Sequence, residues 1–202
     1  MRVILAVLVM GTGQAVAECP TRGALAGGAT AYVRYPDEGV VGLRWLGEGM
    51  VQETTRYPDG EGDFRMISMD GVFIVDEVDL DGEDEIDDSR VTTRFPDDLR
   101  QRLPLGPGQD LKVRALNTFA NLPEVEEEEI IAVRTGGLAE IDIAGCRYQG
   151  FPMLLTYHWG EEGFTSMMTH LPELGVSLEI ARMDHGEDPV PFAPLHFAMQ
   201  PP

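Results

Sequence analysis

The stretch Leu111-Lys112-Val113-Arg114-Ala115 alternates apolar and basic side chains without a break. Because successive side chains of a β-strand point to opposite faces, this pattern predicts a strand with one face in a core and the other in water. Similar alternation recurs at residues 41–45, 140–143 and 176–180. One buried face and one wet face are typical of antiparallel sheets, so the sequence predicts an all-β fold.

Turn-forming residues separate these runs. Clusters of glycine, proline and aspartate occur at residues 58–60, 69–71 and 136–137, and such clusters mark the connections between short strands. By this pattern we expect about twelve strands between residues 30 and 183. We therefore predict one domain over residues 18–183, a single antiparallel meander that forms a curved sheet or a partly closed barrel.

Helical signals are confined to one short segment, residues 96–103. Acidic residues follow Pro96 at its start, arginines lie near its end, and Leu99 and Leu103 are four residues apart. This arrangement is typical of a helix of two turns. We expect at most this one short helix in the fold.

Residues 1–17 have the pattern of a secretory signal peptide. Arg2 precedes an apolar run at residues 3–10, and the small residues Ala15-Val16-Ala17 follow. Cleavage after Ala17 leaves 185 residues with 14 basic and 35 acidic side chains, a net charge of -21. This charge opposes binding to nucleic acid, and no other apolar run reaches the roughly 18 residues that a transmembrane helix needs. We expect an exported, periplasmic protein without a transmembrane segment.

Cys19 and Cys146 are the only two cysteines of the chain. An even pair of cysteines in an oxidising compartment typically forms a disulfide. In the chain-entropy model a bridge over so long a loop stabilises the fold by about 4 to 5 kcal/mol. Glu18 occupies the position at which a lipoprotein signal has a small residue, so we expect no lipid anchor on Cys19.

Acidic residues concentrate in two runs. Residues 76–88 contain nine of them and residues 124–129 contain five. With Gly82 placed at the sharp turn of a twelve-residue calcium loop, five acids fall at ligand positions, although the flanks look like strands rather than helices. A solvated hairpin loop is the alternative. The candidate calcium ligands are Glu77, Asp79, Asp81, Glu85 and Asp88.

The last residues, 184–202, differ in composition from the rest of the chain. Five prolines fall within the final fourteen residues, and proline cannot donate a hydrogen bond to a sheet. We predict a Pro-rich, polyproline-like tail. Phe192, Leu195 and Phe197 suggest that it lies against the sheet, with a tail free in solvent as the alternative.

Motifs of catalysis are missing from the sequence. It contains no G-x-S-x-G elbow, no H-E-x-x-H zinc motif and no complete glycine-rich phosphate loop. We therefore expect neither an enzyme nor a bound cofactor.

Two functions compete at this point. The first is a binding or accessory protein that holds a hydrophobic ligand, or an envelope protein partner, on a concave sheet face. The second is a structural or interaction module of the cell envelope that acts through the acidic loops and binds calcium weakly. The candidate liners of the concave face are Trp45, Tyr57, Trp159 and Phe164.

Three short segments carry a resemblance to a known group of proteins. They are C-P-T-R at residues 19–22, I-A-G-C-R-Y at 143–148 and L-P-E-L-G-V at 171–176. Together they resemble an uncharacterised family of small secreted all-β proteins of Gram-negative bacteria. The resemblance implies that Cys19 pairs with Cys146 and that the protein is exported, and it implies no activity. In outline, the predicted sheet is also similar to the half-barrel carriers that ferry lipoproteins.

Overall fold

A computed structural model describes residues 18–160, 162–184 and 187–202. The signal peptide predicted for residues 1–17 lies outside these described residues. In chain order the first strands are β1 (Thr30–Arg34), β2 (Val40–Gly47), β3 (Met50–Arg56), β4 (Phe64–Met69), β5 (Phe73–Asp81), β6 (Asp84–Glu85) and β7 (Val91–Arg94). They are followed by β8 (Asp110–Phe119), β9 (Leu122–Thr135), β10 (Ala139–Ile143), β11 (Cys146–Trp159), β12 (Glu162–Leu171), β13 (Val176–Asp184), β14 (Val190–Pro191) and β15 (His196–Ala198).

These strands form one antiparallel sheet, which confirms the all-β prediction. The hydrogen-bonded order is β14-β13-β12-β11-β9-β8-β7-β5-β4-β3-β2-β1-β15, with β10 added beside β11 and β6 beside β5. Neighbours in the sheet are therefore mostly neighbours in the chain, as in a meander. The sheet is curved and does not close into a barrel, so the curved-sheet form of the prediction is correct.

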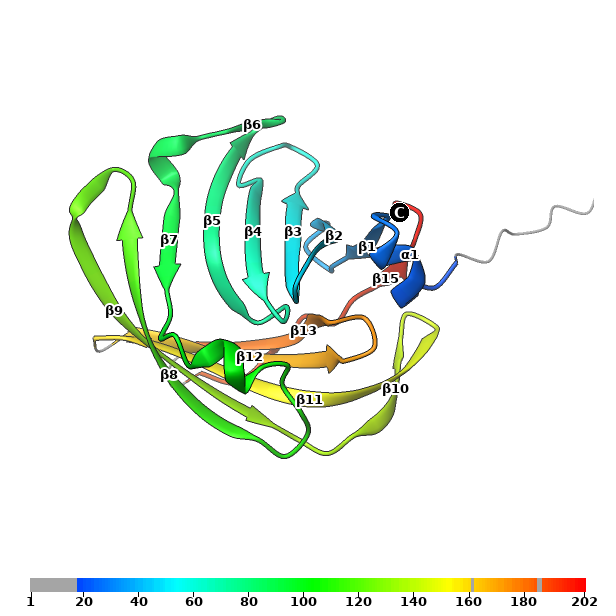
Figure 1. Ribbon diagram of the computed structural model, residues 1–202. Helices are drawn as coiled ribbons and strands as arrows, with labels where there is room; N and C mark the ends of the chain where they lie inside the picture. The colour runs from blue at the N-terminus through cyan, green and yellow to red at the C-terminus, as the bar shows by residue number, and fades with distance from the viewer. Residues whose placement is uncertain (1–17, 161, 185–186) are drawn as a thin grey trace, which may run out of the picture.

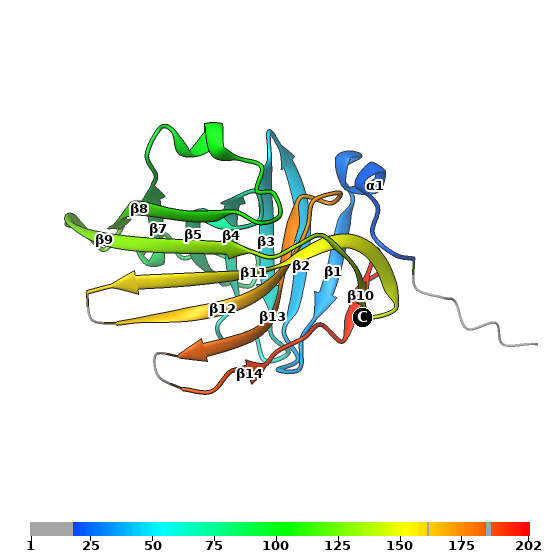
Figure 2. The same ribbon diagram turned by 90° about the horizontal axis from the view of Figure 1, so that it is seen from below.

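The sheet folds over on itself. In Figure 1, β3 to β7 stand across the direction of β11 to β13, and Figure 2 shows the same two halves from below. A single sheet has no second layer to cover its inner face, so bending is the way in which it removes that face from water. The two halves thus enclose the interior of the molecule.

The C-terminal segment joins the two ends of the sheet. β14 pairs with β13 at one end, and β15 pairs with β1 at the other. Between them, the Leu195 N–H donates to the Arg34 carbonyl at 2.8 Å, and the rings of Phe192 and Tyr35 stack at 4.7 Å. The residues predicted as a Pro-rich tail therefore supply two short edge strands, where proline is tolerated.

The predicted disulfide between Cys19 and Cys146 is confirmed, with the two Cα atoms 5.6 Å apart. It joins the N-terminal segment to the start of β11. Nearby, the Tyr148 hydroxyl donates to the Pro20 carbonyl at 2.9 Å. The start of the described chain is thus fixed against strands more than 120 residues away.

The prediction of at most one short helix is confirmed for the described residues, but the α-helix lies elsewhere in the chain. Residues 96–103 contain only the 3₁₀ turn η2 (Leu99–Arg102), and a second such turn is η1 (Asp87–Ser89). Pro104 disfavours helical backbone at Leu103, which is extended, so the turn ends at Arg102. The α-helix of the described residues is α1 (Arg22–Ala26), a single turn too short for its sequence to show a helical period. None of the helices in this part of the chain is long and apolar enough to cross a membrane.

Two apolar cores fill the ends of the folded sheet. The first packs α1 against β1 to β3, the start of β11, β13 and β15, and the second packs β5, β8, β9 and β11 against the segment around η2. Large, fully buried members of the first are Leu25, Leu43, Leu171, Leu174 and Leu178, and of the second Phe73, Leu99, Ile131, Phe151, Met153 and Leu155.

The turn between β4 and β5 connects distant parts of the fold. The Asp70 carboxylate accepts a hydrogen bond from the Leu105 N–H at 2.6 Å. Gly71 has a positive φ of 63° and lies against β13, where an added Cβ would be 2.9 Å from the Ser177 nitrogen and 3.0 Å from the Val176 Cα. Glycine is required here by both its conformation and its contacts.

We predict that Gly71→Ala lowers the free energy of unfolding by about 2 to 4 kcal/mol, through strain at positive φ combined with overpacking. The matched control is Gly60→Ala, because Gly60 also has a positive φ, 74°, but has open space around it. We expect that control to cost about 1 kcal/mol. Urea unfolding of both variants measures the difference, and equal losses would contradict the close approach of this turn to β13.

Candidate functional site

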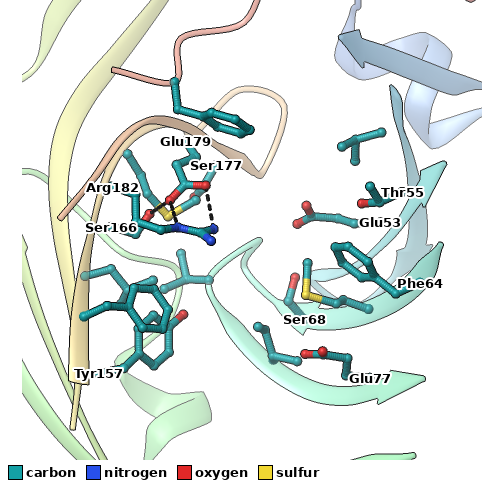
Figure 3. A pocket seen from close by; sticks show the side chains of 18 of the residues that line it. Glu53, Thr55, Phe64, Ser68, Glu77, Tyr157, Ser166, Ser177, Glu179 and Arg182 are labelled. Carbon is teal, nitrogen blue, oxygen red and sulfur yellow. Dashed lines mark hydrogen bonds and ion pairs between the residues drawn. The ribbon is translucent and has the colours of Figure 1, made fainter. Parts of the chain in front are cut away.

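A cavity of about 740 Å³ lies inside the folded sheet. Its wall is built by side chains from β2 to β5, β7 to β9 and β11 to β14, together with residues of the connecting loops. This volume is within the range of about 300 to 1,000 Å³ that is usual for ligand pockets. Figure 3 shows side chains from opposite sides of the sheet facing one another across it.

The cavity exists because the inward face of several strands changes character along its length. On β3, Val51 belongs to the first core, whereas Glu53 and Thr55, two and four residues further on, line the cavity. On β9, Ile131 belongs to the second core and Glu129 lines the cavity. Along these strands the inward face thus passes from the apolar cores to a cavity wall that carries both apolar and acidic side chains.

Three of the four predicted aromatic liners lie at this cavity: Tyr57, Trp159 and Phe164. The fourth, Trp45, packs against the first core and under the Arg22 guanidinium, whose carbon is 4.9 Å from the ring centre. Trp45 shares the inward face of β2 with Val41, which does line the cavity. Strand alternation therefore identified the correct face of β2 but not the position along it.

An aromatic cluster forms one part of the wall. Tyr157 and Phe164 stack with ring centres 4.8 Å apart, and Trp159 meets Phe164 edge-on at 5.9 Å. Burial raises the pKa of Tyr157, and the carboxylates of the cavity raise it further. The Tyr157 hydroxyl therefore stays protonated throughout the ordinary pH range.

Four strands each bring one glutamate to the cavity: Glu53 on β3, Glu77 on β5, Glu129 on β9 and Glu179 on β13. Figure 3 labels Glu53, Glu77 and Glu179, which point into the space from two opposite sides. The described lining residues include a single basic side chain, Arg182. The interior is thus strongly acidic.

The carboxylate of Glu179 has several hydrogen-bond donors. It accepts two hydrogen bonds from the Arg182 guanidinium, at 3.0 and 2.9 Å, and a third from the Ser166 hydroxyl at 2.7 Å. The same guanidinium lies over the Phe164 ring, 5.4 Å from its centre. Arg182 is therefore fully engaged by one carboxylate and one aromatic ring.

The carboxylates of the other three glutamates have fewer hydrogen-bond partners. Glu129 accepts a long hydrogen bond of 3.4 Å from the Asn117 amide, whereas Glu53 and Glu77 have no side-chain partner among the described residues. Burial, reinforced by Glu179, raises the pKa of Glu53 to about 7. Burial also raises the pKa of Glu77, with a contribution from Asp79, and it raises the pKa of Glu129.

The five predicted calcium ligands are not brought together. Glu77 lines the cavity, Glu85 is ion-paired with Arg65 and Arg90 outside it, and the other three candidates are exposed. Across residues 18–160, 162–184 and 187–202, no group of three or more His, Cys, Asp and Glu side chains is arranged to hold a metal ion. The prediction of a calcium loop fails here because the chain forms a hairpin of β5 and β6, which directs neighbouring carboxylates away from one another.

Sequence reasoning missed the cavity residues Glu53, Glu129, Glu179 and Arg182. On β13 the alternation placed Ser177 and Glu179 on a face turned to water, and in the structure this face turns to the cavity. The alternation pattern separates the two faces of a strand, but it carries no information about what lies opposite each face. A signal did exist at Glu53 and Glu129, which are acids on the same strand face as buried valine and isoleucine.

Fold and site together define a class of protein, an open curved antiparallel sheet around an acidic and aromatic cavity. No protein-family model matches the chain, and the search of curated proteins found no match. Among solved structures, the chain is similar to the hypothetical lipoprotein YmcC from Escherichia coli (K12), with 14% sequence identity and a TM-score of 0.44 over 76% of this chain and 77% of that chain.

The raised pKa of Glu53 predicts that the free energy of unfolding depends on pH. Because the folded protein keeps the proton up to about pH 7, while the unfolded chain releases it near pH 4.5, this group stabilises the fold fully below pH 4.5. That stabilisation is lost as the pH rises through 7. We predict that Glu53→Gln, which stays neutral, increases the free energy of unfolding by about 2 to 3 kcal/mol at pH 8 and changes it little at pH 5.

Urea unfolding between pH 5 and pH 8 measures this effect. Glu140→Gln is the matched control, because Glu140 is exposed on β10 and belongs to neither core nor cavity. The control should follow the pH dependence of the wild type. A Glu53→Gln variant with that same pH dependence would contradict the burial of this carboxyl group.

Proposed function

We propose that the protein is an exported, periplasmic binding protein without catalytic activity, which holds a ligand with an apolar body inside the folded sheet. The observation that carries the proposal is the cavity of about 740 Å³ with its cluster of Tyr157, Trp159 and Phe164. Ligand sites typically combine such apolar and aromatic walls with a few placed polar groups. Serine, threonine and glutamate side chains supply those groups here.

The disulfide supports the exported location. Disulfides persist in oxidising compartments such as the periplasm and are rare in the cytosol. Cys19 and Cys146 are both consumed by the bridge, so no free cysteine remains in the described chain for redox or nucleophilic chemistry.

A non-catalytic role is supported by the environment of the His170–Ser177 pair, of which Ser177 lines the cavity. His170 and Ser177 form a cross-strand hydrogen bond of 2.9 Å, which resembles a base and a nucleophile. However, His170 is completely buried, burial lowers its pKa to about 4, and its Nε2 atom has no partner. A catalytic pair needs a third group to orient the base, and no carboxylate in the described residues does so.

The alternative of an interaction module with acidic loops receives less support. In the acidic run at residues 76–88, Asp76 and Glu85 are held by Arg65 and Arg90. Asp76 and Glu85, two of the nine acids of this run, are therefore engaged within the sheet rather than free for a partner.

Occupancy of the cavity can be tested with its own tryptophan. Trp159 lines the cavity and Trp45 lies outside it, so Trp45→Phe leaves one reporter inside and Trp159→Phe leaves one outside. Bromine quenches tryptophan fluorescence only near contact, so a neutral brominated ligand such as 10-bromodecan-1-ol reports where it binds. We predict saturable quenching in Trp45→Phe and little quenching in Trp159→Phe.

The same experiment has a clear contrary result. Absence of saturable quenching of Trp159, or equal quenching of both tryptophans, would contradict a ligand site within the folded sheet. Native mass spectrometry of the protein, purified from the periplasm of the cells that produce it, gives a second measurement. We expect it to detect a co-purified small molecule.

A further inference from the structure

The charge of the cavity wall is one-sided. Its described lining residues include seven acidic side chains and one basic side chain. The basic one, Arg182, is already paired with Glu179 in a two-point contact. An anionic ligand would therefore meet uncompensated negative charge on entry, and a neutral ligand would leave that charge unpaired in a partly dry space.

Two carboxylates lie at a fixed spacing on one wall. Glu53 on β3 and Glu77 on β5 both pair across the sheet with Met66 on β4. They are thus two strand spacings apart, which corresponds to about 9 to 10 Å between their Cα atoms. This spacing suits a bulky cationic group placed between the side chains rather than one small ion held by both.

A separate buried group on the same wall also lacks a partner. Ser68 on β4 is only 2% exposed, and its hydroxyl oxygen has no hydrogen-bond partner although it lines the cavity. Figure 3 shows Ser68 on the same wall as Glu53 and Glu77, two residues along β4 from Met66, which is the register partner of both glutamates. Buried polar groups in proteins are nearly always hydrogen-bonded, so this hydroxyl is available to bond with whatever occupies the cavity.

The contacts of Arg182 show how a cationic group can bind to this wall of the cavity. The Arg182 guanidinium lies over the Phe164 ring and against the Glu179 carboxylate. A cation over an aromatic face is stabilised by the negative potential of the ring. Tyr157, stacked on Phe164, extends the same aromatic surface toward the glutamates of the opposite wall.

We propose that the natural ligand is an amphiphilic organic cation, with an ammonium or guanidinium group between Glu53 and Glu77 and an apolar body against Tyr157, Trp159 and Phe164. This inference rests on the proposed binding function and specifies its ligand class. A metal ion fits less well, because the described residues contain no cluster of three ligating side chains.

The test compares three probes with one apolar body and different charge. They are (10-bromodecyl)trimethylammonium, 10-bromodecan-1-ol and 10-bromodecanoate, each titrated into the Trp45→Phe protein at pH 8 below its micelle concentration. We expect the cation to quench Trp159 with an affinity at least tenfold higher than that of the neutral probe. The anion should bind more weakly than either.

Variants then assign the charge preference to particular residues. Glu53→Gln and Glu77→Gln keep the shape of the side chain and remove its charge, so each should weaken binding of the cation roughly tenfold to a hundredfold and leave the neutral probe unchanged. Glu140→Gln, outside the cavity, is the matched control and should change neither. Arg182→Gln releases Glu179 and should strengthen binding of the cation.

The possible results separate the two proposals. Equal affinity for cation and neutral probe, or preference for the anion, would overturn the cationic ligand while leaving the binding function in place. Cation binding that is unaffected by Glu53→Gln and Glu77→Gln would overturn it as well. Absence of binding by all three probes would contradict the binding function itself.

Discussion

The hydrogen bond between the Leu195 N–H and the Arg34 carbonyl, with the stacked rings of Phe192 and Tyr35, joins the two ends of the sheet. The rest of the structure depends on this join. One sheet without a covering layer buries its inner face only while its halves stay folded together, and the free edges of β13 and β1 are covered by β14 and β15. Because the Cys19–Cys146 bridge also holds the start of the described chain against β11, segments from both ends of the described residues restrain the folded sheet.

This restraint explains how a polar cavity persists. Two separate apolar cores supply the packing, and the space between them contributes little hydrophobic stabilisation. Glu53 and Glu77 reduce the stability further at neutral pH, because burial opposes their ionisation. A fold under selection for stability alone would fill this space with apolar side chains, so its persistence favours a role in binding.

The sequence was informative where the physics is local. Alternation at residues 111–115 identified β8, the turn at residues 69–71 was recognised, and an even pair of cysteines indicated its own disulfide. It was uninformative where the outcome depends on distant packing. Val51 and Glu53 lie on one face of β3, and only the opposite half of the sheet decides that the first is in a core and the second in a cavity. The two short strands of residues 184–202 were not predictable for the same reason, since they exist only beside β13 and β1.

Two neighbouring acids on β5 show that the negative charges of the chain differ in their surroundings and in their effect on stability. Asp76 lies on the outer face, where Arg65 and Arg90 hold it together with Glu85. Glu77, the next residue, points inward and has no partner among the described residues. Paired acids on the outer face stabilise the sheet by modest amounts and leave little charge for a ligand. Unpaired acids inside a cavity have the opposite properties, because they oppose folding and favour any cation that can reach them. The net charge of the chain therefore combines partly paired acids on the outer face of the sheet with unpaired acids inside the cavity.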